Sequence, residues 1–161
     1  MINTKIKGNI KNRKELERIV QNNTVLHSYL FLGENGIGKK EIAKEFAKQI
    51  LCLAHKDKCD CKSCICFETD NHPDFQLINN EGETIKISTI REMISTVYEK
   101  PILSKKKIYI INDADKMTKE AQNSLLKTLE EPPEYIIIIL IASNTDMILN
   151  TIKSRCTKII F

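Results

Sequence analysis

The chain has 161 residues, 42% of them hydrophobic and 29% charged, proportions that fit one globular domain and exclude a disordered chain. Its 25 basic and 21 acidic residues nearly balance, and a net charge of +4 does not by itself indicate a nucleic-acid partner. The longest apolar run, 135–142, is far short of the ~18 residues of a membrane span, and segment 1–8 has no apolar stretch typical of a secretion signal, so we expect a cytoplasmic protein without a membrane partner.

The first third of the chain predicts a helix, a strand and a second helix. Leu16, Ile19 and Val20 have helical spacing in a charged segment, and 29–32 is a short apolar run that ends at a glycine-rich turn. Over 39–51 apolar residues recur every four positions, which indicates a helix with one buried face. We therefore expect a strand, a glycine turn and a helix in direct succession.

The rest of the chain alternates strands and helices. Strands are predicted at 74–78, 107–111, 135–142 and 157–161. Ser88 can cap a helix that ends before Pro101, a second helix ends at Pro132, and 147–152 indicates a short third helix. The inward-facing residues of the two longer helices are predicted to be Ile90, Met93, Ile94 and Val97, and Ala121, Leu125, Leu126 and Leu129. Such alternation predicts an α/β domain with a five-stranded, mainly parallel sheet flanked by helices.

The glycine-rich turn has the pattern of a phosphate-binding loop. Gly33-Glu-Asn-Gly36-Ile-Gly38-Lys39 fits G-x-x-x-x-G-K, between a strand and a helix as the pattern requires. The glycines would let backbone N–H groups point at phosphate oxygens, and Lys39 would reach the outer phosphates. The next position, normally a Ser or Thr that binds Mg²⁺, is Lys40. The alternative is a glycine-rich turn with a solvated lysine.

The turn after the strand at 107–111 supplies the second half of this predicted site. Asn112 stands where an aspartate would bind Mg²⁺, and Asp113 stands where a glutamate would polarise the attacking water. Asparagine is a poorer magnesium ligand, and Asp113 is one methylene shorter than glutamate. Together with Lys40, these changes indicate lost hydrolysis and disfavour ATP with Mg²⁺ as a cofactor. A simple turn that ends the strand is the alternative.

Five cysteines lie within the short segment 52–66. Cytosolic proteins seldom use such clusters for disulfides, so a metal site is the first hypothesis, and four thiolates suit a structural Zn²⁺. Free thiols and oxidation are the alternatives. Cys156 lies far away in the sequence and is expected to be a buried apolar residue. His72 precedes Pro73 and is expected to shape the start of the next strand rather than to bind metal.

Four motifs, in this order along the chain, resemble the clamp-loader AAA+ proteins of bacterial replication and, within them, the group of delta-prime subunits. They are HSYLF at 27–31, HPD at 72–74, AQNSLLKTLEEPP at 121–133 and TIKSRC at 151–156. The resemblance spans nearly the whole chain. It implies a RecA-like AAA+ domain over 1–161 with a small zinc-binding insertion at about 52–66. The lid and collar domains of the family are not found in this sequence, so we expect it to be the N-terminal domain of a longer protein.

The resemblance also implies roles for individual residues. In this family the Ser-Arg-Cys triplet carries an arginine that enters the ATP site of a neighbouring subunit, so Arg155 is expected to act in trans as an arginine finger. Asn144 aligns with a sensor residue that positions water or the γ-phosphate in active relatives. The insertion favours Cys52, Cys59, Cys61 and Cys64 as the zinc ligands, with Cys66 as an alternative, although one residue rather than two separates Cys59 from Cys61.

These implications predict a clamp-loader stator, a component of DNA polymerase III that does not itself hydrolyse ATP. It would assemble with the ATPase subunits and the delta subunit, present Arg155, and help load the sliding clamp onto primed DNA. The alternative within the family is an ATP-hydrolysing subunit of the gamma or tau kind. A small-molecule P-loop kinase would need the missing magnesium Ser/Thr and a substrate lid, and a zinc adaptor would use 52–66 as its partner surface. The run 105–107 (KKK) is expected to be a solvated loop rather than a DNA contact.

Overall fold

A five-stranded sheet in the order β2-β3-β4-β1-β5 organises the computed structural model, which describes residues 8–56 and 59–161. The strands are β1 (Ser28–Leu32), β2 (Phe75–Ile78), β3 (Lys107–Ile111), β4 (Ile136–Ala142) and β5 (Thr157–Ile160). Every pairing between them is parallel, as the alternation of strands and helices predicted. The prediction for segment 1–8 falls almost wholly outside the described residues.

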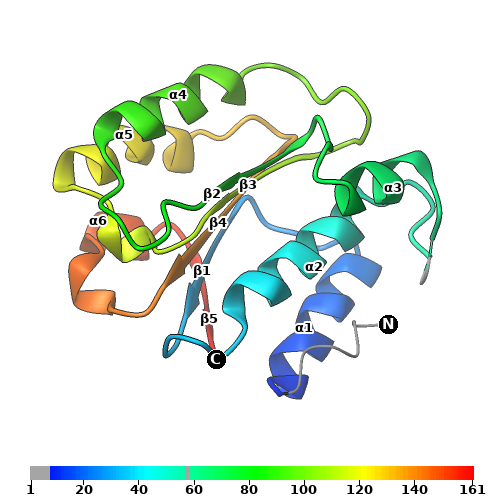
Figure 1. The fold of residues 1–161 in the computed structure, drawn as a ribbon, viewed down its shortest axis with the longest axis horizontal. Coiled ribbons are helices and arrows are strands. Elements are labelled where there is room, and N and C mark those ends of the chain that lie inside the picture. The colour runs from blue at the N-terminus through cyan, green and yellow to red at the C-terminus, as the bar shows by residue number, and fades with distance from the viewer. Residues whose placement is uncertain (1–7, 57–58) are drawn as a thin grey trace.

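Helices cover both faces of this sheet (Figure 1). They are α1 (Ile10–Gln21), α2 (Lys39–Leu51), α3 (Lys62–Glu68), α4 (Ile87–Val97), α5 (Lys119–Glu130) and α6 (Asn150–Lys153), with short 3₁₀ turns η1 (Ala114–Lys116) and η2 (Thr145–Met147). Helices α1 to α3 lie on one face, and α4 to α6 lie on the other (Figure 1). Within the part of the chain that the structure describes, no helix is long and apolar enough to cross a membrane.

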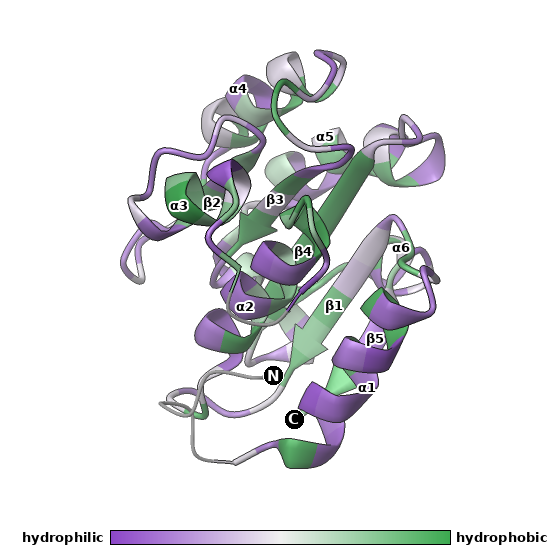
Figure 2. Cartoon of the chain, turned by 90° about the vertical axis from the view of Figure 1, so that its right-hand side faces the viewer, coloured by the Kyte–Doolittle hydropathy of each residue, from purple (hydrophilic) through white to green (hydrophobic). Residues whose placement is uncertain are grey.

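Side-chain alternation along the strands produces two hydrophobic cores. On β1, Tyr29 and Phe31 pack with α1 and α2, whereas Leu30 and Leu32 pack with α4 and α5. All seven residues of β4 are buried because both faces of the sheet are covered. In Figure 2, β4 is hydrophobic along its length, while α2 shows both hydrophilic and hydrophobic residues. The predicted inward-facing residues of α4 and α5 all belong to these cores or pack against them.

Two predicted boundaries are corrected by tertiary contacts. Ser88 lies inside the first turn of α4, whose N-cap is Lys86 without a side-chain hydrogen bond. The chain reaches that point extended, because Ile85 pairs with Met117 in an isolated bridge. The predicted helix at 147–152 is instead η2 followed by α6. Gln122 holds the intervening backbone extended, since its amide donates to the Met147 carbonyl and accepts from Leu149 N.

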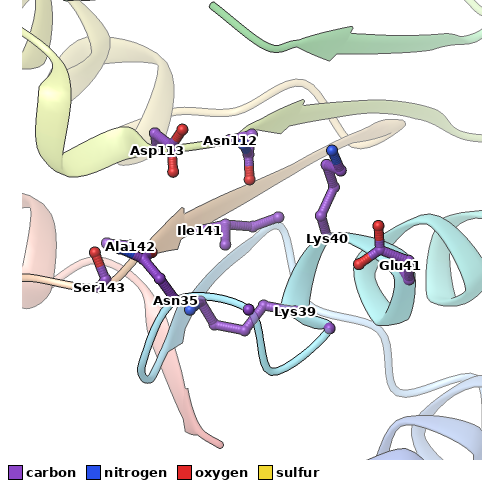
Figure 3. Close-up of a pocket in the computed structure, with 11 residues that line it drawn as sticks. Asn35, Lys39, Lys40, Glu41, Asn112, Asp113, Ile141, Ala142 and Ser143 are labelled. Atoms are coloured by element: carbon purple, nitrogen blue, oxygen red, sulfur yellow. The ribbon is translucent and has the colours of Figure 1, made fainter. Parts of the chain in front are cut away.

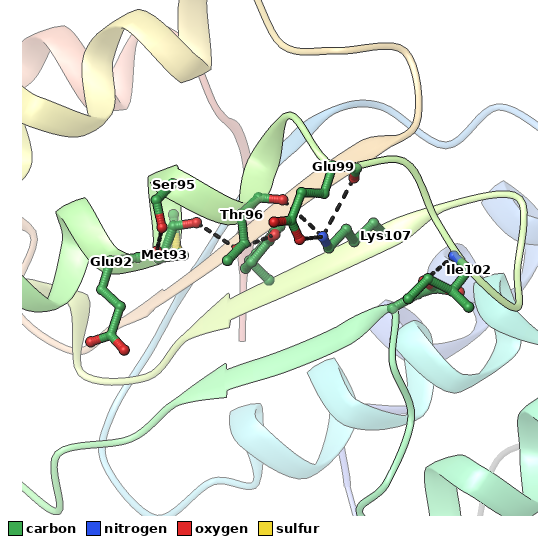
Figure 4. A network of polar contacts seen from close by, with 9 residues as sticks. Glu92, Met93, Ser95, Thr96, Glu99, Ile102 and Lys107 are labelled. Atoms are coloured by element: carbon green, nitrogen blue, oxygen red, sulfur yellow. Dashed lines mark hydrogen bonds and ion pairs between the residues drawn. The ribbon is translucent and has the colours of Figure 1, made fainter.

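The lysine run at 105–107 is not a uniformly solvated loop. Lys107 is buried at the start of β3, and its ammonium donates to the carbonyl of Thr96 at 2.8 Å. Glu99 lies beside the same ammonium, 3.8 Å from carboxylate to nitrogen, so the end of α4 is fastened to β3 (Figure 4). Lys106 donates to the carbonyl of Glu134. The expectation of a solvated loop is therefore wrong for Lys107, which is a structural cation.

Candidate functional site

A cleft of about 450 Å³ lies at the carboxyl ends of β1, β3 and β4 (Figure 3). Ligand sites of parallel α/β sheets form at this edge, where loops leave the strands. Three segments line the cleft: the glycine-rich loop with the start of α2, the turn after β3, and the end of β4. The lining residues are Asn35, Gly36, Gly38, Lys39, Lys40, Glu41, Asn112, Asp113, Ile141, Ala142 and Ser143. The structure thus brings together most of the predicted phosphate site.

The glycines of the loop serve different purposes. Gly36 and Gly38 have φ values of 81° and 85°, a left-handed conformation that side chains disfavour, and Gly38 is the N-cap of α2. Gly33 is needed for space, because a Cβ there would lie 2.7 Å from Ile37 Cδ1 and 3.1 Å from the carbonyl oxygen of Phe161. Gly33 does not line the cleft. Its lack of a side chain allows the start of the loop to pack against Ile37 and Phe161.

Lys39 folds back onto its own loop. Its ammonium donates to the carbonyl oxygens of Gly33 at 2.7 Å and Glu34 at 2.5 Å. Burial lowers the pKa of Lys39, and the carboxylates of Asp115 and Asp113 act in the opposite direction. A bound phosphate would have to compete with these two carbonyls for the Lys39 ammonium.

Lys40, Asn112 and Asp113 face the cleft from two sides. Asn112 donates its side-chain N–H to Asn79 Oδ1 at 2.9 Å, which leaves its amide oxygen directed into the cleft (Figure 3). Lys40 extends from the start of α2 to the level of Asn112 (Figure 3). No ion pair or hydrogen bond of the Lys40 ammonium is found among the described residues. The positions that would bind Mg²⁺ in an active site therefore present a free ammonium and a neutral amide.

Asp115 connects the turn after β3 to the segment after β4. This residue was not identified from the sequence. Its buried carboxylate Oδ2 accepts hydrogen bonds from Ser143 N at 3.1 Å, from Ser143 Oγ at 3.0 Å and from Asn144 N at 2.8 Å. The predicted sensor residue Asn144 is exposed and does not line the cleft; its side chain accepts from Asp146 N. Asp115 could have been found as a candidate because it is the third polar residue of the acidic turn that begins at Asn112.

Arg155 lies at the opposite end of β1 from the cleft. The hydroxyl of Ser28, the first residue of β1, donates to the Arg155 carbonyl, whereas the glycine-rich loop follows Leu32, the last residue. Five residues of β-strand span about 16 Å. The guanidinium, about a third exposed, donates to Thr151 O at 2.7 Å and to Glu130 Oε1 at 2.5 Å. The structure does not bring Arg155 into the cleft of its own chain.

Four cysteines form a second candidate site. The Sγ atoms of Cys52, Cys59, Cys61 and Cys64 all lie within 4.8 Å of one another, and Cys66 is not in this group. Sulfur atoms around a tetrahedral Zn²⁺ lie about 3.8 Å apart, so small movements would complete such a site. Residues 57–58 of this segment lie outside the described residues.

Within this cluster, backbone N–H groups favour the thiolate form of Cys61. Cys61 N donates to Cys59 Sγ at 3.4 Å. Burial opposes ionisation of Cys61, but N–H groups of Cys64 and Leu53 lower the pKa of its thiol to about 6. Burial, followed by the neighbouring thiols, raises the pKa of Cys64. The four residues could hold one metal ion, which would stabilise the thiolates that otherwise repel one another.

The HPD motif connects the cysteine segment to the sheet. His72 Nδ1 accepts from Asp74 N at 3.0 Å, and Nε2 lies 2.8 Å from the hydroxyl of Ser63 in α3. The fully buried carboxylate of Asp74 accepts from three successive backbone N–H groups, those of residues 102–104. His72 shapes the start of β2, as predicted, and Cys156 is buried, also as predicted.

Comparison with known proteins adds an independent line of evidence. Residues 8–161 match the family model described as DNA polymerase III, delta subunit. DNA polymerase III subunit delta' of Bacillus subtilis is 38% identical over 150 residues, which are 92% of this chain and 46% of that protein. DNA polymerase III subunit tau/gamma of Haemophilus influenzae is 36% identical over 142 residues, which are 86% of this chain and 20% of that protein.

Solved structures give the same picture. A DNA polymerase III gamma subunit-related protein from Thermotoga maritima superposes with a TM-score of 0.70 and 28% identity, over 93% of this chain and 45% of that one. The Holliday junction branch migration motor RuvB of Thermotoga maritima has a TM-score of 0.54 at 15% identity, over 96% of this chain and 45% of that one, and supports the fold alone. The chain spans about half the length of the first of these relatives, and less of the tau/gamma relative.

Proposed function

The chain belongs to the delta-prime family of DNA polymerase III clamp-loader subunits, and from this membership we propose that it works as a stator. In this role it assembles with the ATPase subunits and the delta subunit, and it presents Arg155 to the ATP site of a neighbour. It does not hydrolyse ATP itself. Through the complex it helps load the sliding clamp onto primed DNA.

The placement of Arg155 carries the proposal for an arginine finger. The residue and the cleft lie at opposite ends of β1, so Arg155 cannot serve the cleft of its own chain. Subunits packed head to tail place one end of each chain against the other end of the next. In such an array Arg155 of this chain faces the cleft of a neighbour. There a guanidinium stabilises the charge that develops on the transferring phosphate.

The cleft supports the lack of hydrolysis. Lys40 replaces the hydroxyl that would bind Mg²⁺, and Asn112 replaces the aspartate. Asp113, one methylene shorter than glutamate, sits in a left-handed conformation at φ 51°. An ATP-hydrolysing subunit of the gamma or tau kind is the second candidate, favoured by the retained Lys39 and by relatives of that name at similar identity.

The cysteine cluster supports a structural Zn²⁺. Four sulfur atoms and no histidine or carboxylate make up the group, and a closed set of four thiolates is typical of structural zinc. His72 is not a candidate ligand, because both of its ring nitrogens have partners within the fold. The bound ion would fix 52–64 against the sheet through the contact of Ser63 with His72.

The stator proposal is tested by reconstitution. The ATPase subunits, the delta subunit, the sliding clamp and primed DNA are combined with and without the chain, in its full natural length. We expect omission to lower both clamp loading and the DNA-stimulated ATPase rate, and size-exclusion chromatography to show the chain within the complex. Equal rates without the chain, or failure to co-elute, would overturn the proposal.

A further inference from the structure

The cleft keeps the features that bind phosphate although it lacks those that bind magnesium. The glycine-rich loop, the N-terminus of α2 and Lys39 all face a cavity of about 450 Å³. Gly36 and Gly38 hold this loop in left-handed backbone conformations that other residues disfavour. The open question is how phosphate charge could be neutralised there without a metal ion.

The charges of the substituted positions answer this question. A serine, an aspartate and one Mg²⁺ ion together carry a single positive charge. Lys40 and Asn112 carry the same single positive charge with no ion at all. The two substitutions therefore leave the charge presented to a phosphate chain unchanged, whereas either one alone would alter it.

The positions of the side chains agree with this charge balance. Figure 3 shows Lys40 rising to the level of Asn112, whose amide oxygen is directed into the cleft. This is the space between the phosphate loop and the end of β3, where the metal is held in P-loop NTPases. Lys40 is half-buried, and its ammonium has no ion pair or hydrogen bond among the described residues, so it is available to a ligand.

The acidic residues at the cleft do not cancel Lys40. The carboxylates of Asp113 and the buried Asp115 interact with Lys39, which is also held by two loop carbonyls. Glu41, which also lines the cleft, is exposed to solvent. Among the described cations of the cleft, Lys40 is thus the one whose charge is left for an anion.

We propose that the cleft binds the polyphosphate chain of a nucleotide without a magnesium ion, the ammonium of Lys40 taking the place of the metal. The inference rests on the proposed role of this chain as a subunit that does not hydrolyse ATP. Magnesium should weaken binding, because a metal carried by the nucleotide would meet the Lys40 ammonium. The bound nucleotide would be a structural ligand that orders the glycine-rich loop.

The test is isothermal titration of the chain with ATP and with ADP, in EDTA and in excess MgCl₂ at matched ionic strength. We expect the Kd in EDTA to be about tenfold lower than in MgCl₂, as one charge-assisted contact would give. Pyrophosphate should displace ATP in EDTA. Undetectable binding at millimolar nucleotide in EDTA, binding that Mg²⁺ tightens, or failure of pyrophosphate to compete would each overturn the inference.

Variants assign the effect to Lys40. Lys40→Thr should weaken binding in EDTA about tenfold and remove the inhibition by Mg²⁺. The double variant Lys40→Thr with Asn112→Asp should bind more tightly with Mg²⁺ than without. Lys44→Thr, one turn later on α2, removes the same charge outside the cleft and should bind like the wild type. An unchanged Kd for folded Lys40→Thr would overturn the inference. The stator role is tested separately, by assembly of the complex and by the ATPase rate of the complex with Arg155→Ala.

Discussion

The hydroxyl of Ser28 donates a hydrogen bond to the backbone carbonyl oxygen of Arg155, with 2.7 Å between the two oxygens. This contact fixes the backbone of the proposed arginine finger to the first residue of β1. The cleft begins beyond the last residue of the same strand. The length of β1 therefore sets the distance between the cleft of this chain and Arg155, the residue proposed to enter the cleft of a neighbouring subunit.

Ser28→Ala should lower the free energy of unfolding by about 1–3 kcal/mol, because it leaves the Arg155 carbonyl without this partner. Urea denaturation followed by circular dichroism measures the change. Ser95→Ala is the matched control, since Ser95 is exposed and bonds only within α4 (Figure 4), and it should change stability by less than about 0.5 kcal/mol. Equal effects of the two variants would show that the contact does not hold Arg155.

Replacing the clustered cysteines should separate the four ligands from the fifth thiol. If the proposed zinc site is correct, loss of bound zinc is expected in each of four variants, because each removes one of its four thiolates: Cys52→Ser, Cys59→Ser, Cys61→Ser and Cys64→Ser. Cys66→Ser should keep one zinc per chain. Metal content by mass spectrometry after gel filtration gives the readout. Loss of zinc from Cys66→Ser would instead make Cys66 a ligand.

Zinc removal should also loosen the backbone outside the cysteine segment, at residues 102–104. The Ser104 hydroxyl donates to Leu51 O at 2.7 Å, and the Ser63 hydroxyl donates to the same carbonyl at 2.6 Å. We therefore expect chelation to speed amide hydrogen exchange at 102–104 as well as in α3, while β3 and β4 stay protected. Exchange confined to the cysteine segment would contradict this coupling.

Stability should fall in mild acid because of His72. Burial lowers the pKa of His72 from its ordinary 6.5, and the Asp74 carboxylate opposes the shift only in part. Nδ1 accepts the Asp74 N–H, so a proton there would break that bond. Below pH 6.5 the unfolded chain binds the proton more readily than the folded chain does, and the free energy of unfolding declines by up to about 1.4 kcal/mol per pH unit.

The measurement compares urea unfolding of the wild type and His72→Asn between pH 7.5 and pH 5.5, with zinc in excess. Asparagine keeps an acceptor for the Asp74 N–H but does not titrate. We expect a smaller loss of stability on acidification in the variant, whatever its stability at pH 7.5. Parallel pH profiles would assign the acid sensitivity to other groups, such as the cysteines.

The strands and the phosphate loop could be predicted because each depends on a short stretch of sequence. Strands buried on both faces are continuously apolar, as β4 is, and a glycine pattern followed by lysine encodes its own turn. Lys40 and Asn112 were likewise visible as substitutions at fixed positions of a pattern. Their shared cleft followed from the parallel sheet, whose carboxyl strand ends lie at one edge.

Contacts between distant segments could not be predicted in this way. Asp115 contacts Ser143 and Asn144 only because β3 pairs with β4. The sequence near Asp115 does not indicate which strand lies beside β3. Ser88 has a residue type suited to an N-cap, but the bridge of Ile85 sets the N-cap of α4 two residues earlier, at Lys86. The predicted solvated loop failed at Lys107 for the same reason, since its partners lie in α4 and the loop that follows it.

The ATPase rate of the reconstituted complex tests the central claim most directly. An arginine finger contributes ~10³–10⁵ in rate at the site it serves, so Arg155→Ala should remove the contribution of the adjacent site while assembly is unchanged. Arg155→Lys should also be impaired, because an ammonium cannot make the paired contacts of a guanidinium. Arg91→Ala, an exposed arginine on α4, should behave as wild type. An unchanged rate with Arg155→Ala, together with a lost rate with Lys39→Ala, would contradict the account and favour an ATP-hydrolysing subunit.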